Sequence, residues 1–143
     1  MSSWDQVEFS LSPRTRGCYL ITDEILQNVP QIKNYKIGTI NLFLKHTSAA
    51  LTLCENWDPD VRTDMRTALD RIVPEGDDLY IHSDEGLDDM PAHVKSSLIG
   101  ASITIPIKNG KLATGIWQGV WLCEFRNYRH TRHIVATING LQA

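Results

Sequence analysis

The stretch ASITIPIKNGKL, residues 101–112, decides the fold class. Isoleucine occupies alternate positions at Ile103, Ile105 and Ile107, which is the period of a strand with one buried face. Asn109-Gly110 follows, and this dipeptide is the strongest short-range signal for a β-hairpin turn. The sequence therefore predicts an antiparallel strand pair that returns from Leu112 onward.

Strand patterns extend over much of the remaining chain. Val7, Phe9 and Leu11 alternate with polar residues, which predicts an opening strand. Short runs rich in β-branched and aliphatic residues predict further strands within 18–22, 37–53, 119–124 and 134–138.

Helix signals interrupt these strands. Asp58-Pro59-Asp60 combines a capping carboxylate, a proline at the first helical position and an acid in the first turn, so a helix is expected to run from here to Pro74. Its inward stripe is predicted to be Val61, Met65, Ala68, Leu69 and Ile72.

Two shorter helices are also predicted. Asp89-Met90-Pro91 repeats the same start signal, with Val94 and Leu98 expected inward and Gly100 as the stop. Asp23 is expected to cap a helix that Pro30 ends. The sum is a β-rich α+β fold, a large, mostly antiparallel sheet or sandwich with two to three short helices, in a single domain spanning 1–143.

Composition excludes several classes of function. Fourteen Lys and Arg against seventeen Asp and Glu give a net charge of −3, which argues against a nucleic-acid partner. The chain carries no signal-peptide pattern and no apolar run near the ~18 residues of a membrane span, so we expect a cytoplasmic protein without a membrane partner. Cys18, Cys54 and Cys123 lack paired spacing and are expected to be free thiols among apolar neighbours.

No familiar nucleotide or catalytic motif is present, but three histidines occur at unusual places. His46-Thr47-Ser48 interrupts an apolar stretch, His82 follows Leu79-Tyr80-Ile81, and His93 lies in the first turn of a predicted helix. If they converge with an open position, they suit Zn²⁺ or a similar divalent ion, whereas a single histidine would more simply be a hydrogen-bonded core residue.

Acidic residues crowd the segment between His82 and His93, and they extend upstream of it. Seven carboxylates occur within 75–89, and such a cluster is either a solvated loop or a set of groups bridged by cations. A carboxylate beside the histidines could orient a ligating imidazole or hold Mg²⁺ against a phosphate.

Two further polar groups stand out. Glu55 and Asn56 precede the main predicted helix, and capping explains them poorly. Gln118, Glu124 and Arg126 interrupt the last aromatic strand. Arg132 belongs to a local basic cluster that either binds phosphate or forms an exposed turn.

These features occur as ordered blocks that resemble the YjbQ family from about Trp4 to Gly140. The blocks are His46–Leu51, Glu55-Asn56, Asp58–Arg62, Asp64-Met65, His82, Glu85-Gly86, Asp88–Ser96, Ile105-Pro106 and Gly115–Leu122. The resemblance implies a compact α+β fold around a large sheet, assembled as a homotrimer with the polar blocks near subunit contacts. Ile116 replaces the threonine of the family's glycine-threonine-tryptophan-glutamine run.

The resemblance also implies a secondary thiamine-phosphate synthase activity, in which a pyrimidine diphosphate joins a thiazole phosphate and pyrophosphate is released. The partner would be a small phosphorylated metabolite and the cofactor a divalent metal, Zn or Mg. From the residues and the resemblance together we predict three sets: His46, Glu55, Asn56, Asp89 and Gln118 as catalytic; Thr47, Ser48, Arg126 and Arg132 as phosphate ligands; and His46, His82 and His93 as metal ligands. The alternatives are a metal- or metabolite-binding protein without turnover and a hydrolase that uses metal-bound water.

Overall fold

A computed structural model describes residues 2–143 as two antiparallel sheets with three α-helices and one 3-10 helix, which confirms the predicted α+β class. The larger sheet has the order β1-β8-β3-β5-β6 and the smaller one the order β2-β7-β4. The strands are β1 (Ser2–Ser10), β2 (Gly17–Leu20), β3 (Tyr35–Leu44), β4 (Ala49–Glu55), β5 (Ser102–Lys108), β6 (Lys111–Leu112), β7 (Gln118–Glu124) and β8 (His133–Gln142). The helices are α1 (Thr22–Asn28), the 3-10 helix η1 (Pro30–Asn34), α2 (Pro59–Ile72) and α3 (Asp89–Ile99).

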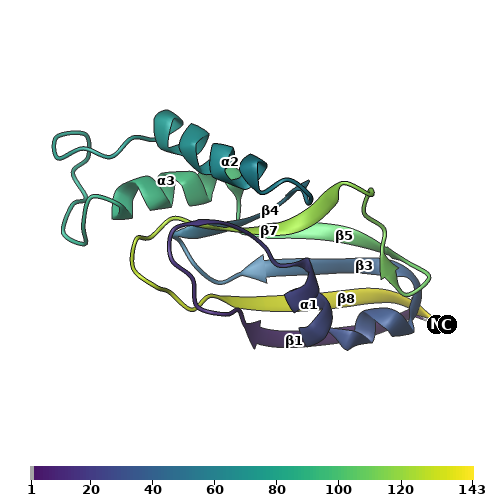
Figure 1. The fold of residues 1–143 in the computed structure, drawn as a ribbon. Helices are drawn as coiled ribbons and strands as arrows, with labels where there is room; N and C mark the ends of the chain where they lie inside the picture. The colour runs from purple at the N-terminus through teal and green to yellow at the C-terminus, as the bar shows by residue number, and fades with distance from the viewer. Residues whose placement is uncertain (1) are drawn as a thin grey trace.

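The elements form three layers. Figure 1 shows α2 and α3 on the outer side of β4 and β7, with the strands of the larger sheet on the other side. Strand β7 is buried from Gly119 to Glu124, and its side chains alternate between two hydrophobic clusters: Val120 and Leu122 enter one, Trp121 and Cys123 the other. The smaller sheet is therefore the middle layer, covered on both faces.

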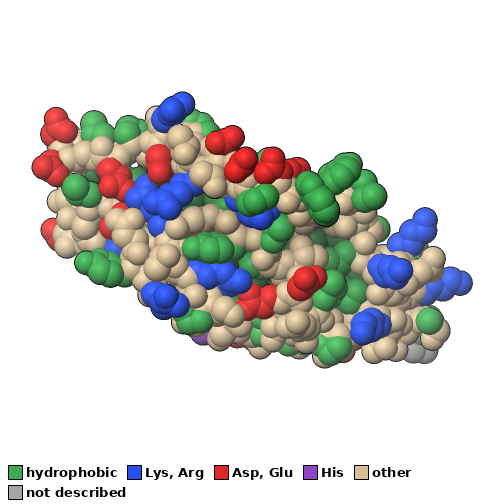
Figure 2. Space-filling model, in the orientation of Figure 1, with side chains coloured by type: hydrophobic (Ala, Val, Ile, Leu, Met, Phe, Trp, Pro, Cys, Tyr) green, Lys and Arg blue, Asp and Glu red, His purple; other side chains and the backbone are tan. Residues whose placement is uncertain are grey.

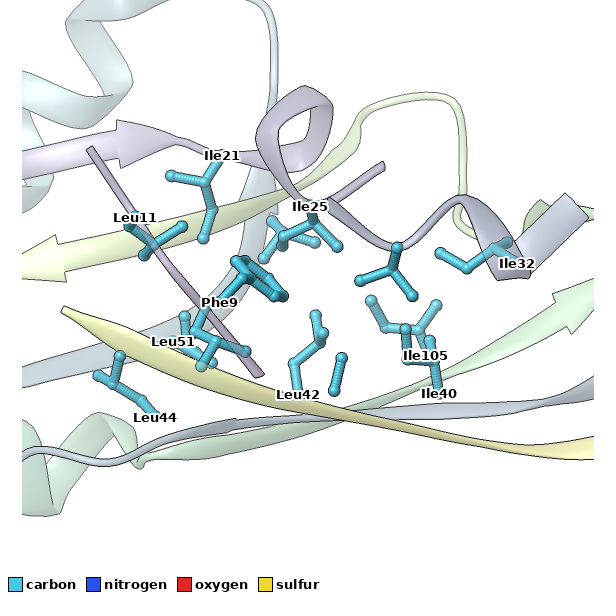
Figure 3. Close-up of a cluster of buried hydrophobic side chains, with 14 of the residues drawn as sticks. Phe9, Leu11, Ile21, Ile25, Ile32, Ile40, Leu42, Leu44, Leu51 and Ile105 are labelled. Carbon is cyan, nitrogen blue, oxygen red and sulfur yellow. The ribbon is translucent and has the colours of Figure 1, made fainter. Parts of the chain in front are cut away.

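The main core fills the space between the two sheets. Figure 3 shows side chains such as Leu42 and Leu51, from β3 and β4, directed into this space. Alternate residues of β8, Ile134, Ala136 and Ile138, are fully buried there, as a strand with one inward face requires. The short helices α1 and η1 add Ile25 and Ile32 to the same cluster.

The predicted hairpin joins β5 to β6. Asn109 and Gly110 both have positive φ, 51° and 76°, as a two-residue turn of type I′ requires. The returning strand is only two residues long, and the chain then leaves the sheet. Gly115, which the sequence placed on a strand, consequently lies in the loop before β7.

Helix α2 begins where predicted but packs with fewer residues. Asp58 accepts a hydrogen bond from the Asp60 backbone N–H at 2.9 Å, which confirms the cap. Val61, Met65 and Leu69 pack against the smaller hydrophobic cluster as predicted. Ala68 and Ile72 were expected inward and are exposed, and Asp70 adds ion pairs to Arg16 and Lys95.

The inward face of α3 also differs from the prediction. Leu98 is exposed, and the buried face carries Ala92, Lys95 and Ser96. Polar residues occupy this face because each has a partner: Lys95 Nζ lies 2.6 Å from Asp70 Oδ1, and Ser96 donates to the Ala49 carbonyl. Gly100 ends the helix with φ of 109°, as predicted.

Two predicted caps were wrong. Asp23 lies inside α1, whose N-cap is Ile21, and the 3-10 helix after Pro30 was not predicted. Asp89 is the first residue of α3 rather than its cap, because the chain already turns at Asp88. Asp89 is therefore free to act elsewhere.

Two other expectations concern the thiols and the membrane. Cys18, Cys54 and Cys123 are free, and Cys123 is fully buried. No helix within residues 2–143 is both long and apolar enough to span a bilayer.

Candidate functional site

Two histidines and one aspartate converge at the start of α3. His82 Nε2 lies 2.7 Å and His93 Nε2 3.2 Å from the same atom, Asp89 Oδ2. One potential ligand atom from each residue lies within 4.8 Å of the other two. The three residues form what we call the His-Asp triangle.

Local structure explains why these residues meet. Asp89 and His93 are four residues apart on α3, so both side chains lie on one face of the helix. The loop between α2 and α3 brings His82 back onto the same helical turn, with its ring centroid 5.6 Å from that of His93. Residues 79–81 form part of this loop, so the loop itself positions His82.

The triangle is both anchored and open. The side chain of Asp89 is 1% exposed, whereas those of His82 and His93 are 50% and 31% exposed. The carboxylate therefore forms the floor of the site, and a ligand can approach from the side of the two rings.

Arg126 anchors the acidic side of the triangle. Its Nη1 donates to Asp89 Oδ1 at 2.8 Å and its Nε donates to Asp88 Oδ2 at 2.9 Å. Burial acts to raise the pKa of Asp88, but the bonds from the Asn127 backbone N–H and from Arg126 outweigh it and hold this pKa below its usual value. Arg126 was predicted to bind phosphate; its guanidinium instead holds these two carboxylates in place.

The orientation of His93 comes from the loop between β3 and β4. Its Nδ1 lies 2.7 Å from the Thr47 carbonyl oxygen, which can only accept, so Nδ1 carries the proton. In a neutral imidazole, Nε2 then presents a lone pair toward Asp89. Thr47 thus contributes its backbone to the site, and its own side chain is exposed.

His46 does not join the His-Asp triangle, contrary to the predicted metal ligand set. Its Nε2 accepts a hydrogen bond from the His133 backbone N–H at 2.8 Å, and its ring stacks on that of His133. Burial first, and then the charge of Arg132, lowers the pKa of His46 below its usual value. His46 does line the same surface recess as His93, a hollow of about 700 Å³ that also includes Ser96 and Ser97.

Ser48 and Arg132 form a buried ion-pair cluster behind this recess. Arg132 donates to Glu124 through Nε and Nη2, each at 2.6 Å, and to the Ser48 hydroxyl at 2.8 Å. Both charged side chains are almost fully buried. The predicted phosphate roles of Ser48 and Arg132 therefore have no open approach within this chain.

Glu55, Asn56 and Gln118 lie at the other end of β4 from His46. Glu55 accepts bonds from the backbone N–H groups of Trp57 and Asp58, and Asn56 donates to the carbonyls of Ile116 and Gln118. Seven residues of extended β4 separate the two groups by roughly 20 Å. Glu55 therefore lies at the entrance to α2, and Asn56 and Gln118 line a separate small recess.

Sequence reasoning did not select two residues that shape the site. Asp88 was grouped with the acidic loop, although its place just before a helix start was a usable signal. Glu124 was seen as a polar break in an apolar strand, but its pairing with Arg132 joins two different segments and has no local signature.

Comparison with known proteins gives a consistent result. The model of the family described as UPF0047 protein YjbQ-like matches residues 7–141. The UPF0047 protein YjbQ of Escherichia coli O157:H7 is 47% identical over 137 residues, which cover 96% of this chain and 99% of that protein. UPF0047 protein sll1880 of Synechocystis is 47% identical over 115 residues, covering 80% of this chain and 78% of that protein.

Solved structures show the same fold. A YbjQ-like protein of unknown function from Sulfolobus solfataricus matches with a TM-score of 0.85 and 25% identity, covering 98% of this chain and 99% of that one. An uncharacterised conserved protein of the yjbq/upf0047 family from Clostridium acetobutylicum matches with a TM-score of 0.80 and 36% identity, covering 92% and 98%. The chain therefore belongs to the YjbQ/UPF0047 family.

Proposed function

We propose that the His-Asp triangle is a divalent-metal centre that acts on a small phosphorylated metabolite. The convergence of His82, Asp89 and His93 on one point carries this proposal. Two imidazoles and one carboxylate are a ligand set of catalytic zinc sites, which use three protein ligands and leave a position open. The exposed side of the two rings supplies that open position.

The hydrogen bonds of His93 leave a place for a cation beside Asp89. With its proton on Nδ1, a neutral His93 directs the Nε2 lone pair at a carboxylate oxygen 3.2 Å away. Two acceptors at this distance repel each other, so a proton or a cation must lie between them. A tetrahedral ion with ligand bonds of about 2.0–2.1 Å holds its ligand atoms ~3.3 Å apart, which matches the distance from His93 to Asp89. The distance from His82 Nε2 to Asp89 Oδ2, 2.7 Å, is that of a hydrogen bond and would have to lengthen when an ion binds.

The surrounding groups favour a transition metal over Mg²⁺. Imidazole nitrogen suits zinc and similar ions, whereas Mg²⁺ prefers oxygen ligands and water. The Thr47 carbonyl orients His93, and Arg126 orients Asp89, as outer partners do around metal ligands.

Metal analysis is the direct test. Tag-free protein purified without added metal, then dialysed against Zn²⁺, should retain one ion per chain by elemental analysis. His82→Ala, Asp89→Asn and His93→Ala should each lose it, while His130→Ala serves as a matched control because His130 lies outside the triangle. Retention of the ion in all three triangle variants would refute the centre.

The first reaction to test is the transfer implied by the family resemblance. A metal ion can neutralise a departing pyrophosphate, so the centre could join a pyrimidine diphosphate to a thiazole phosphate. Pyrophosphate release that requires both substrates and His93 would support transfer. Phosphate release from one substrate alone would support hydrolysis by metal-bound water, and stoichiometric binding without product would support a binding protein.

We also propose a homotrimer, as the resemblance implies. Large apolar side chains at the entrance to α2 support an assembly surface, since Trp57, Ile116 and Trp117 are 78%, 83% and 59% exposed. Light scattering during size-exclusion chromatography should give three times the 16.2 kDa chain mass. A monomeric mass at micromolar concentration would contradict this assembly.

A further inference from the structure

An apolar groove lies at the opposite end of the molecule from the His-Asp triangle. It has a volume of about 600 Å³ and runs between α1 and η1 on one side and the β5–β6 turn on the other. Leu26 and Leu112 supply its accessible aliphatic lining, and the buried side chains of Val29 and Ile32 lie beneath them. Figure 1 shows η1 and this turn at the end that holds the chain termini, far from the first turn of α3.

Backbone bonds hold the two walls of the groove together. The Gly110 N–H donates to the Tyr35 carbonyl at 2.7 Å, and the Asn109 N–H donates to the Lys36 carbonyl at 2.8 Å. A Cβ at Gly110 would lie 2.9 Å from the Lys33 carbonyl oxygen, so the turn approaches η1 as closely as glycine allows. The groove is therefore preformed, which lowers the entropic cost of binding.

The rim of the groove carries lysines without acidic partners. Lys33 and Lys111 line it, and Lys36 and Lys108 stand beside it. None of the four forms an ion pair in the part of the chain that the structure describes, although the chain is acidic overall. Figure 2 shows the resulting group of Lys and Arg side chains at this end, next to hydrophobic surface. The Asp5 carboxylate accepts a hydrogen bond from the Tyr35 hydroxyl and forms no ion pair with these lysines, all of which lie within residues 2–143.

We propose that this groove binds a small amphipathic anion, with its apolar body on Leu26 and Leu112 and its carboxylate or phosphate group beside Lys33 and Lys111. The apolar lining favours an apolar body, and the two lysines without acidic partners favour an anionic head. The groove shares no residue with the His-Asp triangle, so a test of anion binding here does not depend on the proposed metal centre.

The test uses three ligands of equal chain length: octanoate, octyl phosphate and the uncharged octanamide. In ¹H–¹⁵N spectra, the charged ligands should shift the amides of Leu26, Lys33 and Lys111 and leave those of His82 and His93 unchanged. Octanamide should bind at least about tenfold more weakly, because it offers no charge to the lysines. The tighter of the two anions identifies the head group.

Variants separate this site from general surface adhesion. Lys33→Glu with Lys111→Glu should weaken anion binding at least about tenfold, whereas Lys36→Glu with Lys108→Glu, the same charge change outside the groove, should weaken it less than about threefold at physiological salt. Leu26→Glu should also abolish binding, and it provides a second test on the apolar wall if the double variant is unstable. Equal binding of octanamide, or wild-type affinity in the Lys33 and Lys111 variant, would overturn the proposal.

Discussion

Arg126 is the side chain that connects the acidic loop to the end of β7. Its contacts to Asp88 and Asp89 fix the floor of the triangle without occupying the open side. Removing such an outer partner typically weakens metal binding by about 10–100-fold. We expect this loss for Arg126→Ala in a competition titration with a chromogenic chelator. Arg129→Ala, at an exposed position, is the control, and equal affinities of the two variants would show that Arg126 does not support the site.

Arg132 and Glu124 form a buried ion pair whose two halves depend on each other. Breaking such a pair leaves one charge buried and unpaired, at a cost of about 3–5 kcal/mol. Arg132→Met should lower the free energy of unfolding by this amount in urea titrations. The double variant Arg132→Met with Glu124→Leu should recover most of it, and a double variant no more stable than the single one would contradict the pairing argument.

His46 gives the stability of the molecule a pH dependence of known sign. Its pKa is lowered in the folded chain, so below its ordinary value of 6.5 the unfolded chain binds the proton more readily than the folded chain does. Stability is therefore lost as the pH falls from about 6.5 toward the folded pKa. Thermal unfolding between pH 7.5 and pH 5 should show a smaller loss for His46→Gln than for the wild type. Parallel curves for the two proteins would exclude this contribution.

At the scale of elements, Asp58 starts α2, whose packing against the sheet is light. Because Leu69 is the most buried residue of this helix and Val61 and Met65 are only partly buried, the cap contributes a larger share of the helix's stability than usual. Asp58→Ala should cost about 1 kcal/mol, and Asp58→Ser should cost less, since serine also caps. Urea unfolding of both variants measures the difference. Equal losses of stability in the two variants would mean that the Glu55 carboxylate, which accepts from the backbone N–H groups of Trp57 and Asp58, stabilises the helix start in place of the side chain at position 58.

Two neighbouring strands of the larger sheet approach each other closely at a pair of glycines near the chain termini. Gly38 of β3 lies opposite Gly140 of β8, and a Cβ at Gly140 would lie 2.2 Å from the Ile37 carbonyl oxygen. Gly140→Ala must push the strands apart and should cost about 1–3 kcal/mol, as overpacking does. Gly100→Ala tests backbone strain instead, since no atom lies near its Cβ position but its φ is positive. A Gly140 variant with wild-type stability would contradict the close approach.

Element type could be predicted from the sequence where a local pattern determines it. The Ile103 to Ile107 alternation, the Asn109-Gly110 turn and the Asp58 cap each depend on neighbouring residues and were confirmed. Helix faces could not be predicted in this way. Lys95 is buried because Asp70 on another helix neutralises it, and a pattern of apolar residues along one helix does not contain that information.

At the scale of the whole molecule, the candidate site could be predicted only in part. His82 approaches His93 because a short loop connects His82 to the start of α3, and the sequence predicts that helix start. The separation of His46 from Glu55 follows from the length of β4, which carries the two family blocks to opposite ends of a strand. Proximity along the chain is therefore a poor guide to proximity in space once a strand lies between two motifs.

The pairing of β1 with β8 has a consequence for how this chain can be rebuilt. Ser2 lies opposite Leu141, and Figure 1 shows both ends of the chain at one place. Partners across an antiparallel pair are only about 4.5–5.5 Å apart at their Cα atoms, so a short glycine linker could join them. New ends cut into the exposed acidic loop near Asp77 would then give a circularly permuted protein in which His82 lies close to the new N-terminus. The segment that carries His82 could then be changed without altering the two sheets.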